Sequence, residues 1–141
     1  MTRPKPLDPL AALPGYALRR AANAMMAELG ARLDVLDLRI SDASVLMLAE
    51  GPGDRTSSEI GKILDIQRAN MVPLLNRQEE TGLIERVPIN LKSQAIRLTA
   101  QGRERLAEVR RVIDAFEKDL MERIPKEHRP HFLPALQALI D

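Results

Sequence analysis

Apolar residues recur every three or four positions through the first half of the chain, a period that belongs to helices. Residues 1–14 hold four of the ten prolines, show no such period, and are expected to form a flexible arm. From residue 15 to about residue 40 the apolar positions fall on one stripe, which predicts a long amphipathic helix. A second helix is predicted from a cap at Ser41 to about Glu50, because a Gly-Pro-Gly turn at 51–53 then stops it.

The next two predicted helices are short and close together. The sequence Thr-Ser-Ser-Glu at 56–59 matches a capping box and opens a third helix that runs to Leu64. Residues 65–67 break the pattern, and a fourth helix follows from Arg68 to Thr81, after which a glycine ends it. Two helices of this length joined by so short a turn are typical of a helix-turn-helix.

The apolar period then changes from helical to alternating. Short strands are predicted at 83–87 and 95–98, with residues 88–94 as a hairpin loop. Thr99 is expected to cap a long fifth helix. A last helical region closes the chain, and we expect Pro130 to break it.

The predicted order of elements is four helices, a hairpin and two helices. This order defines a mainly α fold with a small β-hairpin wing, a winged helix-turn-helix with six helices. The first and last helices carry broad apolar stripes far apart in the sequence, and a second copy of the chain would cover them, so a dimer is expected. We therefore expect an arm at 1–14, a dimerisation helix at 15–40, a DNA-binding domain at 41–99 and C-terminal dimerisation helices at 100–141.

Composition narrows the possible chemistry. The chain has no cysteine, which excludes disulfides and thiolate metal sites, and its three aromatic residues are too few to stack the bases of a single strand. Pro130 separates His128 from His131 and no acidic cluster accompanies them, so no metal site is expected. No catalytic set or cofactor fingerprint is visible, so we expect neither an enzyme nor a cofactor. Without a visible signal peptide or membrane span, we expect a cytoplasmic protein with no membrane partner.

Charge is unevenly distributed although the net charge is only +1. The stretch 55–105 carries nine Lys or Arg against six Asp or Glu, a balance of +3, which leaves −2 for the rest of the chain. This asymmetry points to a polyanionic partner such as DNA.

Four segments carry a recognisable pattern: residues 59–64, the stretch Gln-Arg-Ala-Asn-Met-Val-Pro-Leu at 67–74, the Gly-Leu-Ile-Glu-Arg step into the wing at 82–86, and the Leu-Thr-Ala-Gln-Gly-Arg step out of it at 98–103. Together they resemble the multiple-antibiotic-resistance regulator (MarR) family. The resemblance covers about residue 15 to the C-terminus. It implies a MarR-like homodimer whose N- and C-terminal helices interleave, and in which each subunit presents one winged helix to double-stranded DNA.

The same resemblance implies a mechanism. Most members of the family are repressors, and many leave a pseudo-palindromic operator when a small organic ligand binds, such as an aromatic acid, a phenolic compound or an acyl thioester. The sequence assigns no residue to that ligand. A winged-helix module that binds protein instead of DNA is the alternative, and it would present an apolar recognition face; Arg68, Asn70 and Arg77 argue against it.

The exposed start of the fourth helix is expected to enter the major groove, where Arg68 suits guanine and Gln67 or Asn70 suits adenine. Without the surrounding motif, Arg68 and Arg77 would be interpreted as solvated helix charges. Arg86 and Arg97 would serve equally well in structural ion pairs. The full set of expected DNA-binding residues is Ser57, Ser58, Gln67, Arg68, Asn70, Met71, Arg77, Arg86 and Lys92.

Three positions depart from the family pattern. Asn90 and Lys92 stand where an aspartate and an arginine commonly form the wing tip, so weaker wing contact is expected because lysine lacks the planar fork. Gln78 occupies a position that usually holds a core leucine, so either the helix is rotated or the amide has a partner. Pro73 lies inside the fourth helix and predicts a kink or an irregular first turn at 69–73.

Overall fold

The computed structural model describes residues 8–51 and 53–140, so residues 1–7 of the predicted arm and Pro52 of the predicted turn lie outside it. Six α-helices, two short 3-10 turns (η) and one antiparallel hairpin lie within these ranges, which confirms the predicted winged helix-turn-helix. None of these helices is long and apolar enough to cross a membrane. In chain order the elements are α1 (Pro14–Leu33), η1 (Asp34–Leu36), α2 (Ile40–Glu50), α3 (Ser57–Leu64), α4 (Arg68–Glu80), β1 (Ile84–Pro88), β2 (Gln94–Leu98), α5 (Ala100–Arg123), η2 (Lys126–His128) and α6 (Arg129–Ile140).

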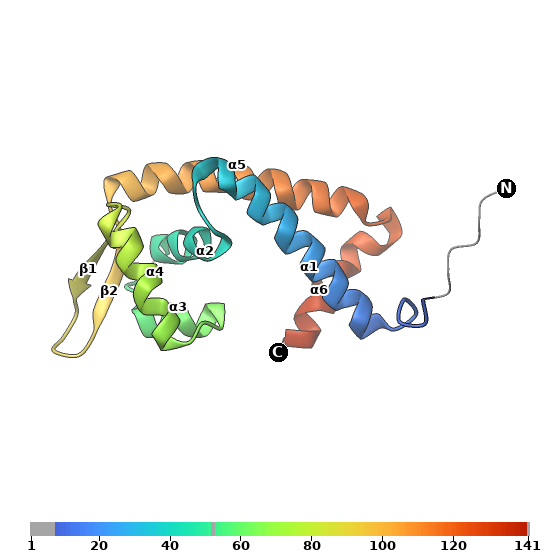
Figure 1. Cartoon of the computed structure of the whole chain (residues 1–141), viewed down its shortest axis with the longest axis horizontal. Helices are drawn as coiled ribbons and strands as arrows, with labels where there is room; N and C mark the ends of the chain where they lie inside the picture. Colours follow the sequence, from blue (N-terminus) through green and yellow to red (C-terminus); the bar gives the residue numbers. More distant parts are fainter. Residues whose placement is uncertain (1–7, 52, 141) are drawn as a thin grey trace.

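The long helix α5 runs along the molecule, and α1 crosses beside it (Figure 1). Helices α2, α3 and α4 and the hairpin gather below one end of α5, and α6 folds back below the other end (Figure 1). Helix α2 contacts α1 and α5 as well as α3, α4 and β2. It therefore joins the long helices to the helix-turn-helix.

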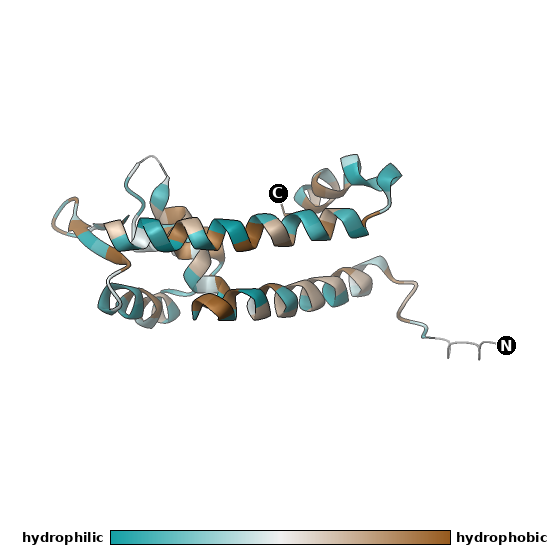
Figure 2. Ribbon diagram, turned by 90° about the horizontal axis from the view of Figure 1, so that it is seen from above, coloured by the Kyte–Doolittle hydropathy of each residue, from teal (hydrophilic) through white to brown (hydrophobic). Residues whose placement is uncertain are grey.

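The hydrophobic core lies in the lobe formed by α2, α3, α4, the hairpin and the first half of α5. Its fully buried side chains include Leu46, Ile60, Leu75, Ile96 and Val109. By contrast, α1 buries only Leu33, and no residue of α6 is buried. Figure 2 shows hydrophobic segments on α6, away from the lobe. The two helices thus carry apolar side chains that a single chain leaves in contact with solvent.

The hairpin is fixed to the start of α5 by close backbone packing. Strands β1 and β2 pair with Ile84 opposite Leu98. Thr99 caps α5, as predicted, because its hydroxyl oxygen accepts from the N–H of Gly102 at 3.0 Å. A Cβ atom at Gly102 would overlap the carbonyl oxygen of Leu83, so this position requires glycine. The angle of the wing relative to α5 depends on this contact.

The predicted cap of the second helix is wrong by two residues. Helix α2 begins at Ile40 with Arg39 as its N-cap, so Ser41 lies inside the first turn. The reason is Asp42, whose carboxylate accepts from the backbone N–H of Arg39 at 2.8 Å. A carboxylate in the first turn satisfies a free N–H and suits the positive end of the helix dipole.

The prolines disturb the helices less than predicted. Helix α4 continues through Pro73, although its first turn is tightened, because the N–H of Asn70 donates to the carbonyl of Gln67 at 2.9 Å, three residues back. The predicted break at Pro130 is wrong. Pro130 lies in the first turn of α6, where a missing N–H removes no helical hydrogen bond.

Candidate nucleic-acid interface

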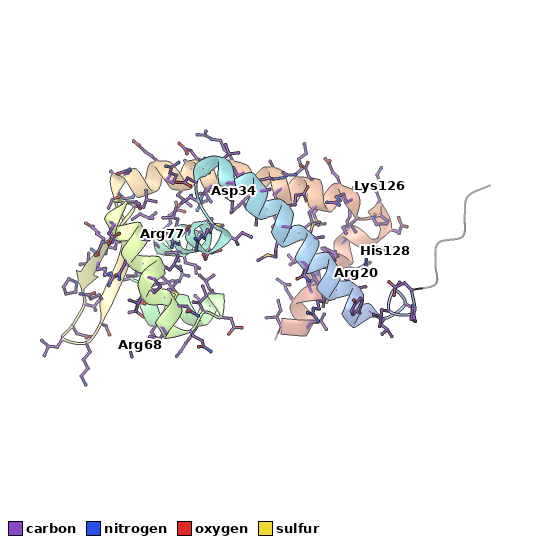
Figure 3. All side chains as sticks on the ribbon, viewed as in Figure 1. Arg20, Asp34, Arg68, Arg77, Lys126 and His128 are labelled. Atoms are coloured by element: carbon purple, nitrogen blue, oxygen red, sulfur yellow. The ribbon has the colours of Figure 1, made fainter. Side chains whose placement is uncertain are left out.

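The start of α4 faces solvent. Gln67, which is the N-cap, and Arg68, Ala69 and Asn70 are all exposed, whereas Leu74 further along packs into the core. Figure 3 places Arg68 at the end of the lobe that lies opposite Asp34 and the long helices. The structure therefore brings together Gln67, Arg68 and Asn70, the polar residues expected to contact bases.

Met71 does not belong to this surface. It is 1% exposed, and a Cβ at Gly61 of α3 would lie only 3.3 Å from its Cγ. The prediction that Met71 contacts DNA is wrong, because the phase of the helix turns this side chain towards α3. The next residue, Val72, is 52% exposed and lies one helical turn after Arg68, on the same face. The i, i+4 spacing from Arg68 is the signal in the sequence that could have placed Val72 on this surface.

The first turn of helix α3 carries the two serines that are expected to contact DNA. The hydroxyl oxygen of Thr56 accepts from the N–H of Glu59 at 3.2 Å, which confirms half of the predicted capping box. Ser57 is half-buried and Ser58 is exposed, and both lie in the first turn beside backbone N–H groups. The helix ends at Asp65, whose left-handed φ of 54° starts the turn into α4.

Arg77 belongs to a polar cluster between α2 and α4, which we call the Asp42 cluster (Asp42, Arg77 and Gln78). Its Nη2 lies 2.6 Å from Oδ1 of Asp42, whose side chain is 5% exposed. Gln78 donates from Nε2 to the backbone carbonyl of Asp42 at 3.0 Å, and its own Oε1 is buried without a partner among the described residues. The amide of Gln78 therefore has a partner, and Arg77 joins the two helices.

The arginines of the hairpin strands are held by acidic or amide groups. Arg86 donates from Nη2 to Oδ1 of Asn76 at 2.6 Å, and its Nε lies 3.4 Å from a carboxylate oxygen of Glu79. Arg97 donates from Nε and Nη2 to the two oxygens of Asp54 at 2.8 and 2.7 Å. These bonds lower the pKa of Asp54 and raise that of Arg97. Arg86 and Arg97 thus brace the wing. Of the two roles considered for them, the structure supports the structural ion pairs.

The tip of the wing is ordered by Asn90. Its side-chain oxygen accepts from the backbone N–H groups of Lys92 and Ser93, at 2.8 and 2.9 Å. Asn90 therefore folds the turn itself, and Lys92 is left exposed. Lys92 is the one predicted DNA-binding residue that lies at the tip.

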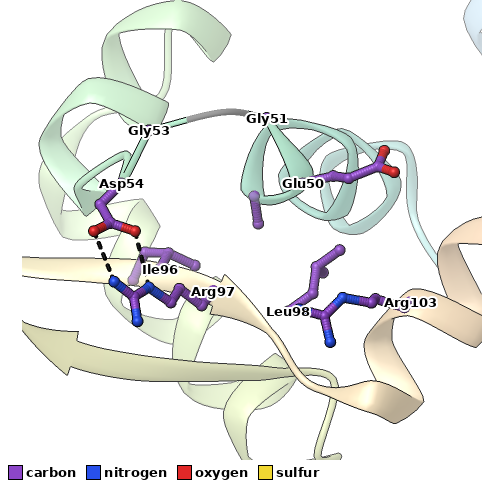
Figure 4. A pocket seen from close by; sticks show the side chains of 9 residues that line it. Glu50, Gly51, Gly53, Asp54, Ile96, Arg97, Leu98 and Arg103 are labelled. Atoms are coloured by element: carbon purple, nitrogen blue, oxygen red, sulfur yellow. Dashed lines mark hydrogen bonds and ion pairs between the residues drawn. The ribbon is translucent and has the colours of Figure 1, made fainter.

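A small pocket of about 190 Å³ lies between the end of α2, β2 and the start of α5 (Figure 4). Its charged lining residues are Glu50, Asp54, Arg97 and Arg103, with the Asp54–Arg97 pair at one side. Pockets that hold small organic molecules usually enclose roughly 300–1,000 Å³. This pocket is smaller than that range, and its lining is strongly charged.

No family model and no curated relative matches this sequence, but many solved structures do. The transcriptional repressor CouR bound to a 23-mer DNA duplex is 29% identical, with 99% of this chain and 100% of that chain covered at a TM-score of 0.88. CouR bound to p-coumaroyl-CoA is 29% identical, with 98% of each chain covered at 0.83. The Mycobacterium tuberculosis MarR family protein Rv2887, in complex with salicylic acid, is 26% identical, with 91% of this chain and 96% of that chain covered at 0.71.

A helix-turn-helix whose second helix starts in solvent beside a braced hairpin defines a winged-helix transcriptional regulator. The similarity to the solved regulators includes the long helices α1 and α5 as well as the winged helix, because it covers almost the whole chain. The chain therefore has the architecture of the MarR family regulators and is similar to them over almost its whole length.

Proposed function

We propose that the chain is a sequence-specific DNA-binding repressor that acts as a homodimer and leaves its operator when a small organic ligand binds. The observation that carries this proposal is the exposed start of α4 beside the wing tip, on one side of the lobe (Figure 3). A helix of this kind fits the major groove of duplex DNA, and the wing reaches the neighbouring groove. The likeness to CouR bound to a DNA duplex supports the proposal.

The bases are read by the outer face of α4. Arg68 pairs with the two acceptors of guanine, and Gln67 or Asn70 pairs with adenine. Val72 adds an apolar contact that suits the methyl group of thymine. Each pair of hydrogen bonds, from Arg68 to guanine or from Gln67 or Asn70 to adenine, contributes about 1–3 kcal/mol of discrimination against the wrong base.

The DNA backbone is contacted by the flanking elements. Ser57 and Ser58 donate to phosphate together with the N-terminal amides of α3. Lys92 contacts the backbone or the minor groove beside the wing. Arg77 and Arg86 act mainly as positioning residues, because their guanidinium groups are bound within the protein.

The dimer is supported by apolar side chains that one chain leaves exposed. Residues 8–24 are all exposed, and α6 buries none of its residues. A second copy would cover the apolar faces of 15–40 and 100–141, leaving 41–99 to bind DNA and 1–14 as an arm. Two copies related by a two-fold axis would read half-sites about 34 Å apart, so the operator is an imperfect palindrome. The exposed apolar residues of this region include Leu13, Leu18, Met26, Leu133, Leu139 and Ile140.

The ligand is an aromatic acid or its thioester, and the protein acts by binding it, not by catalysis. Related structures contain p-coumaroyl-CoA and salicylic acid. Because the described pocket of a single chain holds only about 190 Å³, the ligand site would be completed by the second copy. A ligand that favours a different separation of the two winged helices weakens both half-site contacts together, and a 100-fold loss of affinity needs about 2.7 kcal/mol.

The test starts with duplexes that the purified dimer selects from a random-sequence pool. Arg68→Ala should lose about tenfold or more in affinity for the selected duplex and should discriminate less against base changes under α4. Arg111→Ala, an exposed arginine on α5, is the matched control and should bind like the unmodified protein. Retention of the selected duplex by Arg68→Ala at full affinity would refute the assignment.

A protein-binding winged helix is the second candidate, favoured by exposed Val72 and Ile63 in the helix-turn-helix. It predicts that no duplex is enriched from the pool and that any weak retention is insensitive to base sequence. It also predicts that Val72→Asp, and not Arg68→Ala, abolishes binding of the partner.

A further inference from the structure

The wing tip (residues 89–92) exposes two aliphatic side chains at the end of the proposed DNA-binding surface. Leu91 is fully exposed, at 106%, and Ile89 is 49% exposed. A leucine in this position makes no contribution to the core and leaves its apolar surface in water. Its side chain is therefore free to contact another molecule.

The turn that carries Leu91 is closed by hydrogen bonds on both sides. Asn90 Oδ1 accepts from the N–H groups that follow Leu91, and the N–H of Ile89 donates to the carbonyl of Ser93 at 2.9 Å. Because the backbone of the tip is already fixed, little conformational entropy is lost when Leu91 enters a site.

Positive charge on the hairpin is sparse. Arg86 and Arg97 are bound to side chains of the protein, as described above. Within the described residues, Lys92 is the only hairpin cation that has no ion pair. A wing that contacted DNA through charge alone would have one cation to use, whereas its apex is apolar.

Resting on the proposed function, we propose that Leu91 enters the minor groove and reads it by apolar contact. The groove is about 6 Å wide, and its floor lacks the guanine amino group wherever A·T pairs occur. Aliphatic side chains contact such grooves and insert at steps that unstack easily. Lys92 beside Leu91 meets the phosphates that border the groove.

The position of the wing tip indicates that it contacts DNA and not a protein partner. The tip of the hairpin and Arg68 lie on the same side of the lobe, away from Asp34 (Figure 3). A duplex bound by the start of α4 therefore continues past the tip, and the adjacent lysine complements the charge of its backbone.

The test combines Leu91→Ala with three versions of the duplex selected by the unmodified protein. The base pairs half a helical turn away from the α4 contacts are made A·T, G·C or inosine·C, the last of which has the major-groove edge of G·C without its minor-groove amino group. The unmodified protein should bind the A·T and inosine·C versions about tenfold more tightly than the G·C version, a difference of about 1.4 kcal/mol. Leu91→Ala should bind all three alike, with an affinity close to that of the unmodified protein for G·C.

Met47→Ala is the matched control, because Met47 is also an exposed apolar residue, at 39%, and lies on α2, outside both the wing and the proposed dimer interface. It should keep the preference, and all variants should melt at the same temperature. The inference is overturned if Leu91→Ala keeps the preference, or if the unmodified protein binds the three duplexes equally. These outcomes leave the proposed function standing when Arg68→Ala still weakens binding; failure of the unmodified protein to select any duplex refutes both proposals.

Discussion

Replacing Asp42 by asparagine tests whether α2 positions the recognition helix α4. The two carboxylate oxygens of Asp42 have separate partners: Oδ1 accepts from Arg77 at 2.6 Å, and Oδ2 accepts from the backbone N–H of Arg39 at 2.8 Å. Asparagine has nearly the same size, but only one of its two terminal atoms can accept a hydrogen bond. Asp42→Asn therefore removes the charge and at least one of these two bonds without leaving a cavity.

The expected loss in the free energy of unfolding follows from the burial of Asp42 and Arg77. A hydrogen bond to a charged group contributes about 1.5–3 kcal/mol, and Asp42 is almost fully buried, with 5% of its side chain exposed. The side chain of Arg77 is 42% exposed, so solvent screens part of the attraction and the lower end of that range applies. The bond from Gln78 to the Asp42 backbone carbonyl survives the change. We expect the free energy of unfolding to fall by about 1.5–2 kcal/mol.

A double-mutant cycle of Asp42→Asn and Arg77→Met, measured by urea unfolding at a fixed protomer concentration, isolates the pair. The coupling energy should be about 1–2 kcal/mol, and the same cycle on the exposed pair Arg105–Glu108 should give about 0.5 kcal/mol or less. Additivity within about 0.5 kcal/mol at Asp42 would refute the reasoning. Arg77→Met should also weaken DNA binding less in the Asp42→Asn background than alone, whereas a direct phosphate contact predicts the same loss in both.

Two further predictions concern the wing. Gly102→Ala should destabilise the protein by about 3 kcal/mol or more, because the Cβ meets the Leu83 carbonyl and the backbone must shift, whereas Gly15→Ala in α1 has open space and should not lower the melting temperature. The Asp54 carboxyl should titrate by NMR below 3.8, because Arg97 lowers its pKa, and the midpoint should rise in Arg97→Gln. Since the pKa is lower in the folded state, this pair stabilises the fold fully above pH 3.8, and the contribution is lost as the pH falls through the lower value; an unchanged midpoint would contradict this.

Much of the fold could be predicted because its element ends are specified by local chemistry. The hydroxyls of Thr56 and Thr99 accept from N–H groups three residues ahead, as their capping patterns predict. Gly82 has a φ of +80°, which is the conformation expected of the glycine that ends α4. Each feature depends on neighbours within a few residues, which a sequence displays directly.

The candidate site was less predictable because it depends on contacts distant in sequence. Nothing near Arg77 indicates that it meets Asp42, which lies 35 residues earlier, and Arg97 meets Asp54 across 43 residues. Met71 was assigned to the DNA-facing side by its place in the segment, but the packing of α3 sets the phase of α4 and buries it. Periodicity defines an apolar stripe only to within a residue or so, and this margin is too wide to show from the sequence which of Met71 and Val72 faces outward.

These distant contacts change what the charge of the chain means for DNA binding. Five of the nine cations in 55–105 are engaged within the protein: Arg55 donates to the Leu48 carbonyl, and Arg77, Arg86, Arg97 and Arg105 form ion pairs. Three of the partner acids, Asp42, Asp54 and Glu108, lie outside the segment, so its balance of +3 overstates the charge offered to phosphate. The cations left with neither an ion pair nor a side-chain hydrogen bond among the described residues are Lys62, Arg68, Lys92 and Arg103.

A plot of log affinity for the selected duplex against log salt concentration shows whether only the four unengaged cations or all nine contact phosphate. Each neutralised phosphate contributes about −0.9 to the slope. Four cations per subunit give a limit of about −7 for a dimer, whereas nine would give about −16. A slope steeper than about −10 would mean that the ion pairs open on binding and that Arg77, Arg86 and Arg97 reach phosphate after all. A slope near −7 or shallower leaves specificity to Arg68, Asn70 and the apolar contacts, which is the balance that the exposed surface presents.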